Sequence, residues 1–390
     1  MNALRKYVDK IKPTFEKGGK LGFLHSTFDA FETFLFVPNT VTRKGSHIRD
    51  CVDLKRVMII AVLSLVPALL FGIWNTGYQH SVAYGLNWDF WPIVGYGIVK
   101  ILPLYLVSYI VGLAIEFTSA QLRGHEVNEG YLVSGMIIPL IVPVDVPLWM
   151  LALAVAFAVI FGKEVFGGTG MNIWNPALLA RAFLFFSYPS KMSGDAVWVG
   201  GLGAGNNAWC AGNGLVDGFS GATPLANASM SGLAEHNYTF LNMFLGNIPG
   251  SVGETSVIAI LLGAALLIFT GVASWKIMVS SIAGGLAIGY LGYACGATDL
   301  PGYYQLVMGG FLFGSVFMAT DPVTSAQTEC GKWIYGFLVG ALAVTVRIWN
   351  PGYAEGMMLA ILLMNTFAPL IDHCVIECSI KRQNKKVKIA

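Results

Sequence analysis

A short segment rich in turn-forming residues presents a threonine hydroxyl that is open to chemical modification. The segment reads Asp217-Gly218-Phe219-Ser220-Gly221-Ala222-Thr223-Pro224-Leu225. Its glycines tolerate positive φ, and its aspartate and serine can hydrogen-bond the local backbone. A hydroxyl on so open a loop is accessible to a modifying enzyme. Taken alone, the segment is better explained as a flexible, unmodified outer loop.

Carboxylates within or beside long apolar runs are the second sign of chemistry. These residues are Glu116, Glu129, Glu164, Asp321, Glu355 and Asp372. A charge inside a membrane is costly, so such groups usually face a bundle interior, pair with Lys or Arg, or mark an ion path. Sodium prefers hard oxygen ligands, as other hard cations do. As a group these residues predict a cation-conducting role, although any one of them can also be a structural, paired carboxylate.

The cysteines and histidines do not predict a metal site. The chain has six cysteines and no CxxC pair. Cys374 and Cys378 lie one helical turn apart beside His373, but no second pair of ligands is near them in the sequence. We therefore interpret them as structural residues and expect no bound metal.

The elements that must position these residues are membrane-spanning helices. The chain of 390 residues is 55% hydrophobic and only 12% charged, whereas soluble domains carry about 25% charged residues. Its apolar runs approach the roughly 20 residues that cross a bilayer as a helix. We expect an all-α, polytopic membrane protein with about ten spans, at 57–75, 92–117, 131–144, 147–163, 175–188, 255–273, 277–296, 303–320, 333–348 and 355–372. The third and fifth are short and interrupted by Pro or Gly, which predicts half-helices.

The distribution of Lys and Arg predicts the orientation of the spans. Basic residues are concentrated before the first span and after the last, and the stretch 189–254 contains a single one, Lys191. We therefore expect both termini in the cytoplasm and 189–254 on the outer side of the inner membrane. This divides the chain into a cytoplasmic N-terminal segment (1–56), a transmembrane domain (57–372) and a basic cytoplasmic tail (373–390).

An internal repeat relates the two halves of the chain. The letters Ile-Trp-Asn-Pro at 173–176 recur at 348–351, and Asp145 aligns with Asp321 at nearly the same offset. Each repeat unit contains five spans. An odd number of spans inverts the second unit across the membrane, as in transporters whose broken helices meet near the midplane. Without further information, this pattern favours a non-redox channel or carrier for a small solute.

The motif around Thr223 and several other stretches resemble a known family over nearly the whole chain. The family contains the membrane flavoprotein of the bacterial Na+-translocating NADH:quinone oxidoreductase and its counterpart in the Rnf electron-transport complex. The other matching stretches are Val52–Arg56, His125–Gly130, Lys163–Gly170, Asn175–Ala177, Met318–Pro322 and Glu355–Ala360. The charged N-terminal segment of about fifty residues favours the sodium-pump branch.

The resemblance implies two flavins, a cation path and a quinone site. A flavin transferase would join FMN to Thr223 through a phosphodiester bond, within the motif formed by Asp217, Ser220, Gly221, Ala222 and Thr223. Riboflavin would bind without a covalent bond at Asn172, Asn175 and Asp321, where amides can match the polar edge of the ring. Glu116 and Asp372 match acidic positions tied to sodium uptake. Quinone would bind near Gly112, although Leu113 follows it where relatives carry a second glycine.

The expected function is therefore electron transfer from FMN through riboflavin to quinone, coupled to sodium export. The chain would act as one of the six subunits of a sodium-pumping translocase in the inner membrane, with no nucleic-acid partner. The glycines within 199–216 neither follow a strand nor open a helix, so NADH is expected to bind elsewhere in the complex. That stretch is longer than in relatives, which leaves the pose of the flavin open. The coupling ion, sodium or protons, and the kind of quinone are left open as well.

Overall fold

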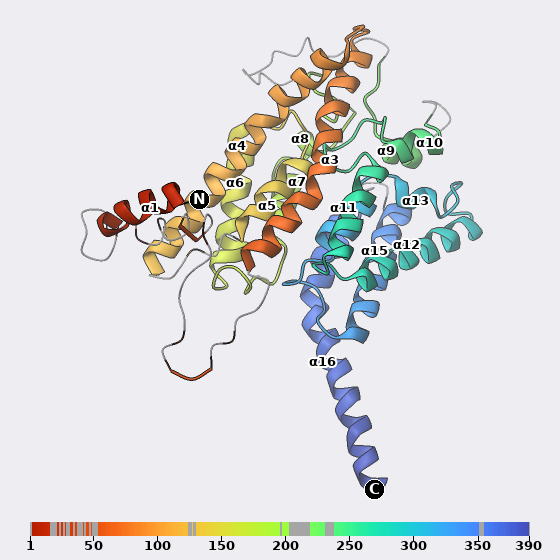
Figure 1. Ribbon diagram of the computed structural model, residues 1–390. Helices are drawn as coiled ribbons and strands as arrows, with labels where there is room; N and C mark the ends of the chain where they lie inside the picture. The colour runs from red at the N-terminus through yellow and green to blue at the C-terminus, as the bar shows by residue number, and fades with distance from the viewer. Residues whose placement is uncertain are drawn as a thin grey trace.

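The protein is a bundle of helices. The computed structural model describes residues 2–15, 54–123, 127, 130–195, 197–202, 219–230, 238–350 and 355–389, with isolated positions between 22 and 48. Within these ranges the regular elements are helices, and no strand is formed. The all-α prediction is thus confirmed. Figure 1 shows the first-half and second-half helices as two neighbouring groups, with the last helix projecting beyond them.

Each of the ten predicted spans coincides with an apolar helical element. In the first half these are α3 (Leu54–Ala83), α4 (Phe90–Arg123), α5 (Tyr131–Ile141), α6 (Leu148–Val159) with the π-helix η2 (Ile160–Glu164), and α7 (Pro176–Ser187). In the second half they are α11 (Val257–Phe269), α12 (Trp275–Ala294), the broken run α13 (Tyr304–Val307), α14 (Phe311–Phe313) and η4 (Gly314–Met318), then α15 (Glu329–Trp349) and α16 (Met357–Ile389). Four short helices, α1 (Asn2–Phe15), α8 (Pro189–Met192), α9 (Pro224–Met230) and α10 (Phe240–Leu245), lie outside this set.

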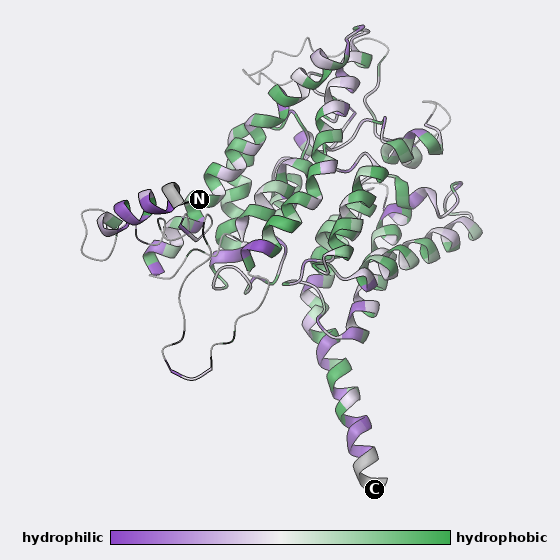
Figure 2. Cartoon of the chain, in the orientation of Figure 1, coloured by the Kyte–Doolittle hydropathy of each residue, from purple (hydrophilic) through white to green (hydrophobic). Residues whose placement is uncertain are grey.

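Five of these helices, α3, α4, α12, α15 and α16, are long and apolar enough to cross a membrane individually. Helices α5, α7 and α11 are shorter, so the third and fifth spans are short as predicted. The eighth span is also broken, which was not predicted. Apolar residues cover the outward faces of the long helices; Leu70 and Ile110, for example, are about two-thirds exposed. Figure 2 shows that hydrophobic residues dominate the bundle, whereas the end of α16 is hydrophilic.

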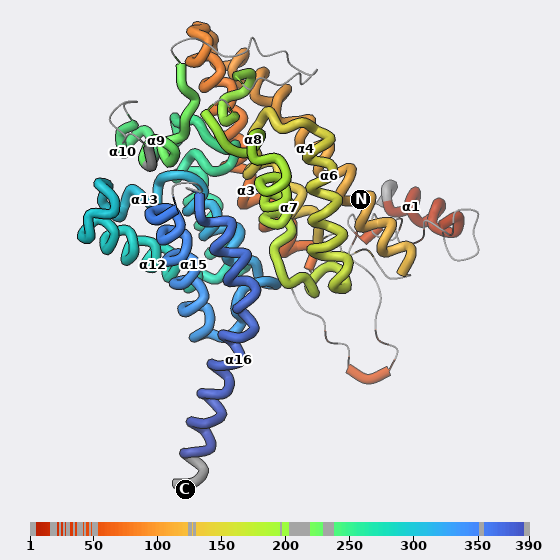
Figure 3. The backbone as a smooth tube through the Cα atoms, turned by 180° about the vertical axis from the view of Figure 1, so that it is seen from behind, coloured from red at the N-terminus to blue at the C-terminus, as the bar shows by residue number. Residues whose placement is uncertain are grey.

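One pair of equivalent helices from the two halves, α3 and α11, packs antiparallel, as an inverted repeat requires. A Cβ atom on Gly72 of α3 would lie 2.1 Å from the carbonyl oxygen of Val252, and one on Gly263 of α11 would lie 2.3 Å from that of Ser64. Residue 72 lies beside residue 252 and residue 64 beside residue 263, so α3 and α11 run in opposite directions. We call this close contact the α3–α11 seam. The view from behind in Figure 3 shows α7 between its own half and the blue helices of the second.

The end of the predicted outer loop re-enters the bundle. Val252 is buried, and the amide of Gly253 donates a hydrogen bond to the carbonyl oxygen of Leu140 (2.8 Å). Glu254 follows, and Ser256 then caps α11 with its side chain. The loop 189–254 therefore delivers its last residues, including a carboxylate, to the interior where the helices break.

Candidate functional site

Thr223 lies at the start of α9, in a backbone shaped by the motif around it. Its hydroxyl oxygen accepts a hydrogen bond from the amide of Ala226 (3.2 Å), as an N-cap residue does. The hydroxyl of Ser220 accepts one from the amide of Ala222 (3.3 Å). A Cβ atom on Gly221 would lie 2.5 Å from the backbone oxygen of Asp195, so this position requires glycine. Asp217, the first residue of the motif, lies outside the described residues.

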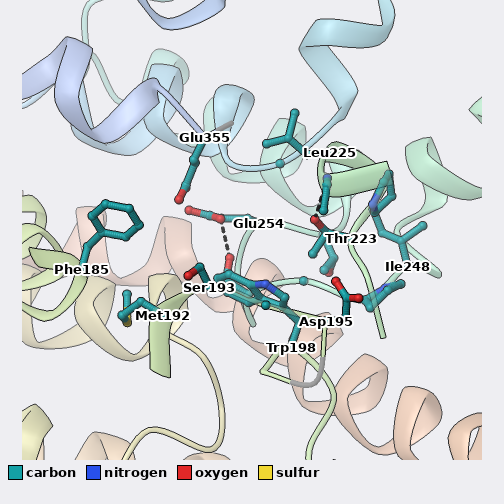
Figure 4. A pocket seen from close by; sticks show the side chains of 18 of the residues that line it. Phe185, Met192, Ser193, Asp195, Trp198, Thr223, Leu225, Ile248, Glu254 and Glu355 are labelled. Carbon is teal, nitrogen blue, oxygen red and sulfur yellow. Dashed lines mark hydrogen bonds between the residues drawn. The ribbon is translucent and has the colours of Figure 1, made fainter. Parts of the chain in front are cut away.

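The side chain of Thr223 lines a partly open cavity, which we call the Thr223 cavity (Figure 4). Aromatic and aliphatic side chains form much of its wall, and polar groups stand among them. The lining includes Arg181, Phe185, Met192, Ser193, Asp195, Trp198, Leu225, Ile248, Ser251, Glu254, Thr255, Glu355 and Met358. A largely apolar cavity with a few converging polar groups is typical of a site for a small organic ligand.

A tyrosine holds the backbone beside Thr223. The hydroxyl of Tyr238 donates a hydrogen bond to the carbonyl oxygen of Ala222 (2.8 Å). Burial raises the pKa of this phenol to about 12, because the charged phenolate is poorly solvated there. Tyr238 therefore keeps its proton, and its hydrogen bond to the motif, throughout the physiological pH range.

A charged triad forms the inner wall of the Thr223 cavity. The guanidinium of Arg181, on α7, contacts Glu254 at 2.7 Å and Glu355 at 2.5 Å. The hydroxyl of Ser251 donates a further hydrogen bond to Glu254. The side chains of Arg181 and Glu254 are less than one-tenth exposed. One cation from the first repeat thus holds two carboxylates that stand just before helices of the second, which ties the repeats together at the cavity.

A second group of contacts anchors the chain upstream of the motif. His80 donates from Nδ1 to the carbonyl oxygen of Gly200 (2.7 Å), and Tyr84 donates to that of Gly201 (2.9 Å). Asp145 accepts from the amide of Gly201 (2.6 Å) and pairs with Lys100 (2.9 Å). Val199 and Leu202, from the same short segment, lie near the position a Cβ on Gly221 would take. The C-terminal end of α3 and the N-terminal part of α4 therefore position the loop that carries Thr223.

Replacing Tyr84 with Phe should loosen this anchor without unfolding the protein. The change removes one hydrogen bond to the carbonyl oxygen of Gly201, which is worth about 0.5–1.5 kcal/mol. We expect faster deuterium exchange in a peptide covering 197–202, measured by mass spectrometry. Tyr78→Phe on the same helix is the control, because the ring of Tyr78 stacks on Trp74. Equal exchange in both variants would show that the Tyr84 bond does not hold the segment.

The three residues expected to bind riboflavin meet in a second cavity. Asn172, Asn175 and Asp321 all line a partly open space, which we call the Asn175 cavity. Asn175 caps α7 by accepting from the amide of Ala177 (3.0 Å), and its amide group donates to Asp321 (3.4 Å). Asp321 also accepts from the amide of Val323 and the hydroxyl of Thr324. Walls from both α3 and η4 complete the cavity.

The residues predicted for ions and quinone differ in burial, and Asp372 is only partly buried. Glu116 is buried and pairs with Lys163. Asp372 accepts hydrogen bonds from the amides of Gln327 (2.7 Å) and Thr328 (2.9 Å), just before α15 begins. A Cβ on Gly112 would lie 2.0 Å from the ring of Tyr131, so the space beside this glycine holds a side chain of the protein itself. Among the other acidic residues, Glu129 lies outside the described residues.

Several polar residues of the two cavities were not anticipated as site residues. Arg181 and Glu254 are brought together from 73 positions apart, and Lys163 contacts Glu116, an expected ion-path residue, from 47 positions away. The available signal was a basic residue within an apolar run, since such a residue needs a partner inside the bundle. That signal does not say which carboxylate the partner is.

The fold and its two cavities define a class: a helical membrane protein built on an inverted repeat, with cavities where broken helices meet. The chain belongs to the NQR2, RnfD, RnfE family, which it matches over residues 41–381. It is 44% identical to a protein of Pseudomonas paraeruginosa that is named as a subunit of Na(+)-translocating NADH-quinone reductase, over 97% of this chain and 98% of the relative. A protein with the same name from Chromohalobacter salexigens is 42% identical, over 98% of this chain and 96% of the relative. One from Azotobacter vinelandii is 41% identical, over 97% of this chain and 98% of the relative. The family membership predicted from the motifs is confirmed.

Proposed function

We propose that the chain is the electron-transferring NQR2 component of a Na+-translocating NADH:quinone oxidoreductase. Identity of 41–44% to named components of that enzyme over nearly the whole chain supports this assignment. The chain would work with the other five subunits of a translocase in the inner membrane. Both termini would face the cytoplasm, and Thr223 would lie near the outer side.

The observation that carries the proposal is the position of Thr223 in the wall of a partly open cavity. A flavin linked to its hydroxyl through a phosphate could place the ring among Phe185, Trp198 and Leu225. The buried hydroxyl of Thr255 lines the same cavity and has no hydrogen-bond partner among the described residues. A polar ligand edge would satisfy this hydroxyl, so the residues present fit a flavin. When bound, the flavin would supply the redox chemistry, while the protein sets its position and electrostatics.

The Asn175 cavity would hold the second flavin, riboflavin, without a covalent bond. Asn172 and Asn175 offer both donors and acceptors, and Asp321 offers acceptors, which suits the amide-like edge of an isoalloxazine ring. Electrons would pass from the Thr223 cavity inward to the Asn175 cavity, and then to a quinone near Gly112 and the charged N-terminal segment. Sodium would enter by way of Glu116 and Asp372.

A denaturing gel tests the covalent part of this proposal. The chain is co-expressed with the flavin transferase, purified and viewed under ultraviolet light before staining. A covalent flavin survives denaturation, so a fluorescent band is expected. A dark band would contradict the redox assignment and favour the alternative that inverted repeats with broken helices also support, a non-redox carrier for a small solute.

Replacing Asn175 with Ser should weaken flavin binding in the second cavity while leaving α7 intact. Serine retains an N-cap acceptor for the amide of Ala177, so the helix start is preserved. The amide group that donates to Asp321 is lost. We expect acid to release less flavin, by about half an equivalent per chain or more. The reason is that one hydrogen bond contributes about 0.5–1.5 kcal/mol to binding. Fluorescence of the covalent flavin in the gel should not change, and unchanged release would exclude Asn175 as a ligand.

A further inference from the structure

Lys163 is a buried cation that stands between a carboxylate and the Asn175 cavity. It belongs to the π-helix η2, and its residue is only 3% exposed. Its ammonium group hydrogen-bonds Oε1 of Glu116, while its side chain lines the cavity together with Asn172, Asn175 and Asp321. Short π-helical turns interrupt α-helices at functional sites more often than elsewhere. Lys163 thus has one anionic partner now and a partly open space beside it.

Glu116 depends on this lysine for its charge balance. Its residue is 4% exposed, and its second oxygen, Oε2, has no hydrogen-bond partner among the described residues. Oε1 receives only a long additional contact from the hydroxyl of Thr169 (3.4 Å). A buried carboxylate that loses its cation is strongly destabilised. If Lys163 turned away, Glu116 would therefore require another cation.

The neighbouring charged groups already have partners of their own. Glu164, the next residue, accepts from the hydroxyl of Ser119 (2.6 Å) and lies 3.8 Å from Arg123. Asp321, across the cavity, is bonded to Asn175, Val323 and Thr324. Among the described residues that line the Asn175 cavity, Lys163 is the only cation. New negative charge in that cavity would therefore act on Lys163 first.

We propose that Lys163 is a switchable counter-ion that couples charge in the Asn175 cavity to sodium binding at Glu116. One electron entering the cavity attracts the ammonium group away from Glu116, and one Na+ takes its place on the carboxylate. One electron and one Na+ arrive together, so the two events balance in charge. When the electron leaves, the ammonium group returns to Glu116 and displaces the ion. This inference rests on the proposed function, because the electron must reach a flavin in that cavity.

Lys163→Met in the purified complex tests the inference, because it removes the charge and keeps a chain of similar length. Without its internal competitor, Glu116 should bind sodium in the oxidised complex more tightly, by roughly 5- to 150-fold, the usual range for coupled sites. This is measured as equilibrium binding of radioactive sodium. The midpoint potential of the acid-extractable flavin should also fall, since the cation beside the reduced ring is gone. Arg123→Gln is the matched control, because Arg123 pairs with the adjacent Glu164.

A double variant shows whether Lys163 acts through Glu116. In Glu116→Gln/Lys163→Met the tighter sodium binding should vanish, while the lowered potential of the flavin should remain. This variant removes both charges together, so it also serves if the single variant does not assemble. Unchanged sodium binding and potential in flavin-loaded variants would overturn the role of Lys163. A wild-type complex that releases no flavin in acid would instead overturn the proposed function of the cavity.

Discussion

Thr223→Val should abolish covalent flavin on this chain and leave its fold intact. Valine has nearly the shape of threonine but lacks the oxygen to which a phosphate can be joined. The hydroxyl also caps the short helix α9 through Ala226, and loss of such a cap costs about 1 kcal/mol. The expected result is therefore complete loss of gel fluorescence and of the added mass of FMN, with only a small change in melting temperature.

Two further variants define the chemistry at this position. Thr223→Ser keeps a hydroxyl and should retain part of the fluorescence. Thr255→Val removes another hydroxyl from the same cavity and should leave the covalent bond in place. Persistent fluorescence in Thr223→Val would mean that the flavin is attached to another residue, even if the chain remains a flavoprotein.

Arg181→Gln should be among the most destabilising single changes in the bundle. It removes the cation that contacts both Glu254 and Glu355. Breaking a buried ion pair by deleting one partner usually costs about 3–5 kcal/mol, and here two carboxylates lose their partner. We expect a marked drop in the thermal melting point of the purified protein in detergent.

The triad and an exposed pair can be compared directly. In the triple variant Arg181→Gln/Glu254→Gln/Glu355→Gln most of the lost stability should return, because no uncompensated charge remains. Lys276→Gln, whose partner Glu329 is largely exposed, should cost only about 0–1 kcal/mol. Equal melting temperatures for Arg181→Gln and Lys276→Gln would show that the triad does not stabilise the contact between the two repeats.

The helical architecture was predictable because its signals are local. Apolar runs of helical length predicted the ten elements, and the repeated letters around Asn175 predicted the inversion that the antiparallel seam confirms. Thr223 could be proposed from the sequence because its motif is contiguous. Asn172, Asn175 and Asp321 are far apart in sequence, yet the structure brings them to one cavity.

Other features were missed because they depend on tertiary packing. The segment 248–254 looks like the end of a polar loop, and its burial follows from the open backbone at Gly72, which lets Val252 approach α3. The break in the eighth span could have been expected from the repeat, since the third span is its counterpart. The partners of Arg181 and Lys163 could not, because several carboxylates were available to each.

The α3–α11 seam has a mechanical consequence for the two cavities. The Asn175 cavity is walled at one end of the seam by Val57 and Val272, and the Thr223 cavity lies beside Ile248, which Asn75 holds at the other end. At Gly72 and Gly263 the backbones touch without intervening side chains, which leaves no soft layer to absorb a displacement. The distance between the two cavities is therefore set by the length of α3, which rises about 1.5 Å per residue. The Thr223 cavity and the Asn175 cavity are therefore held at a fixed distance from each other. A larger side chain in the seam would disturb both cavities at once.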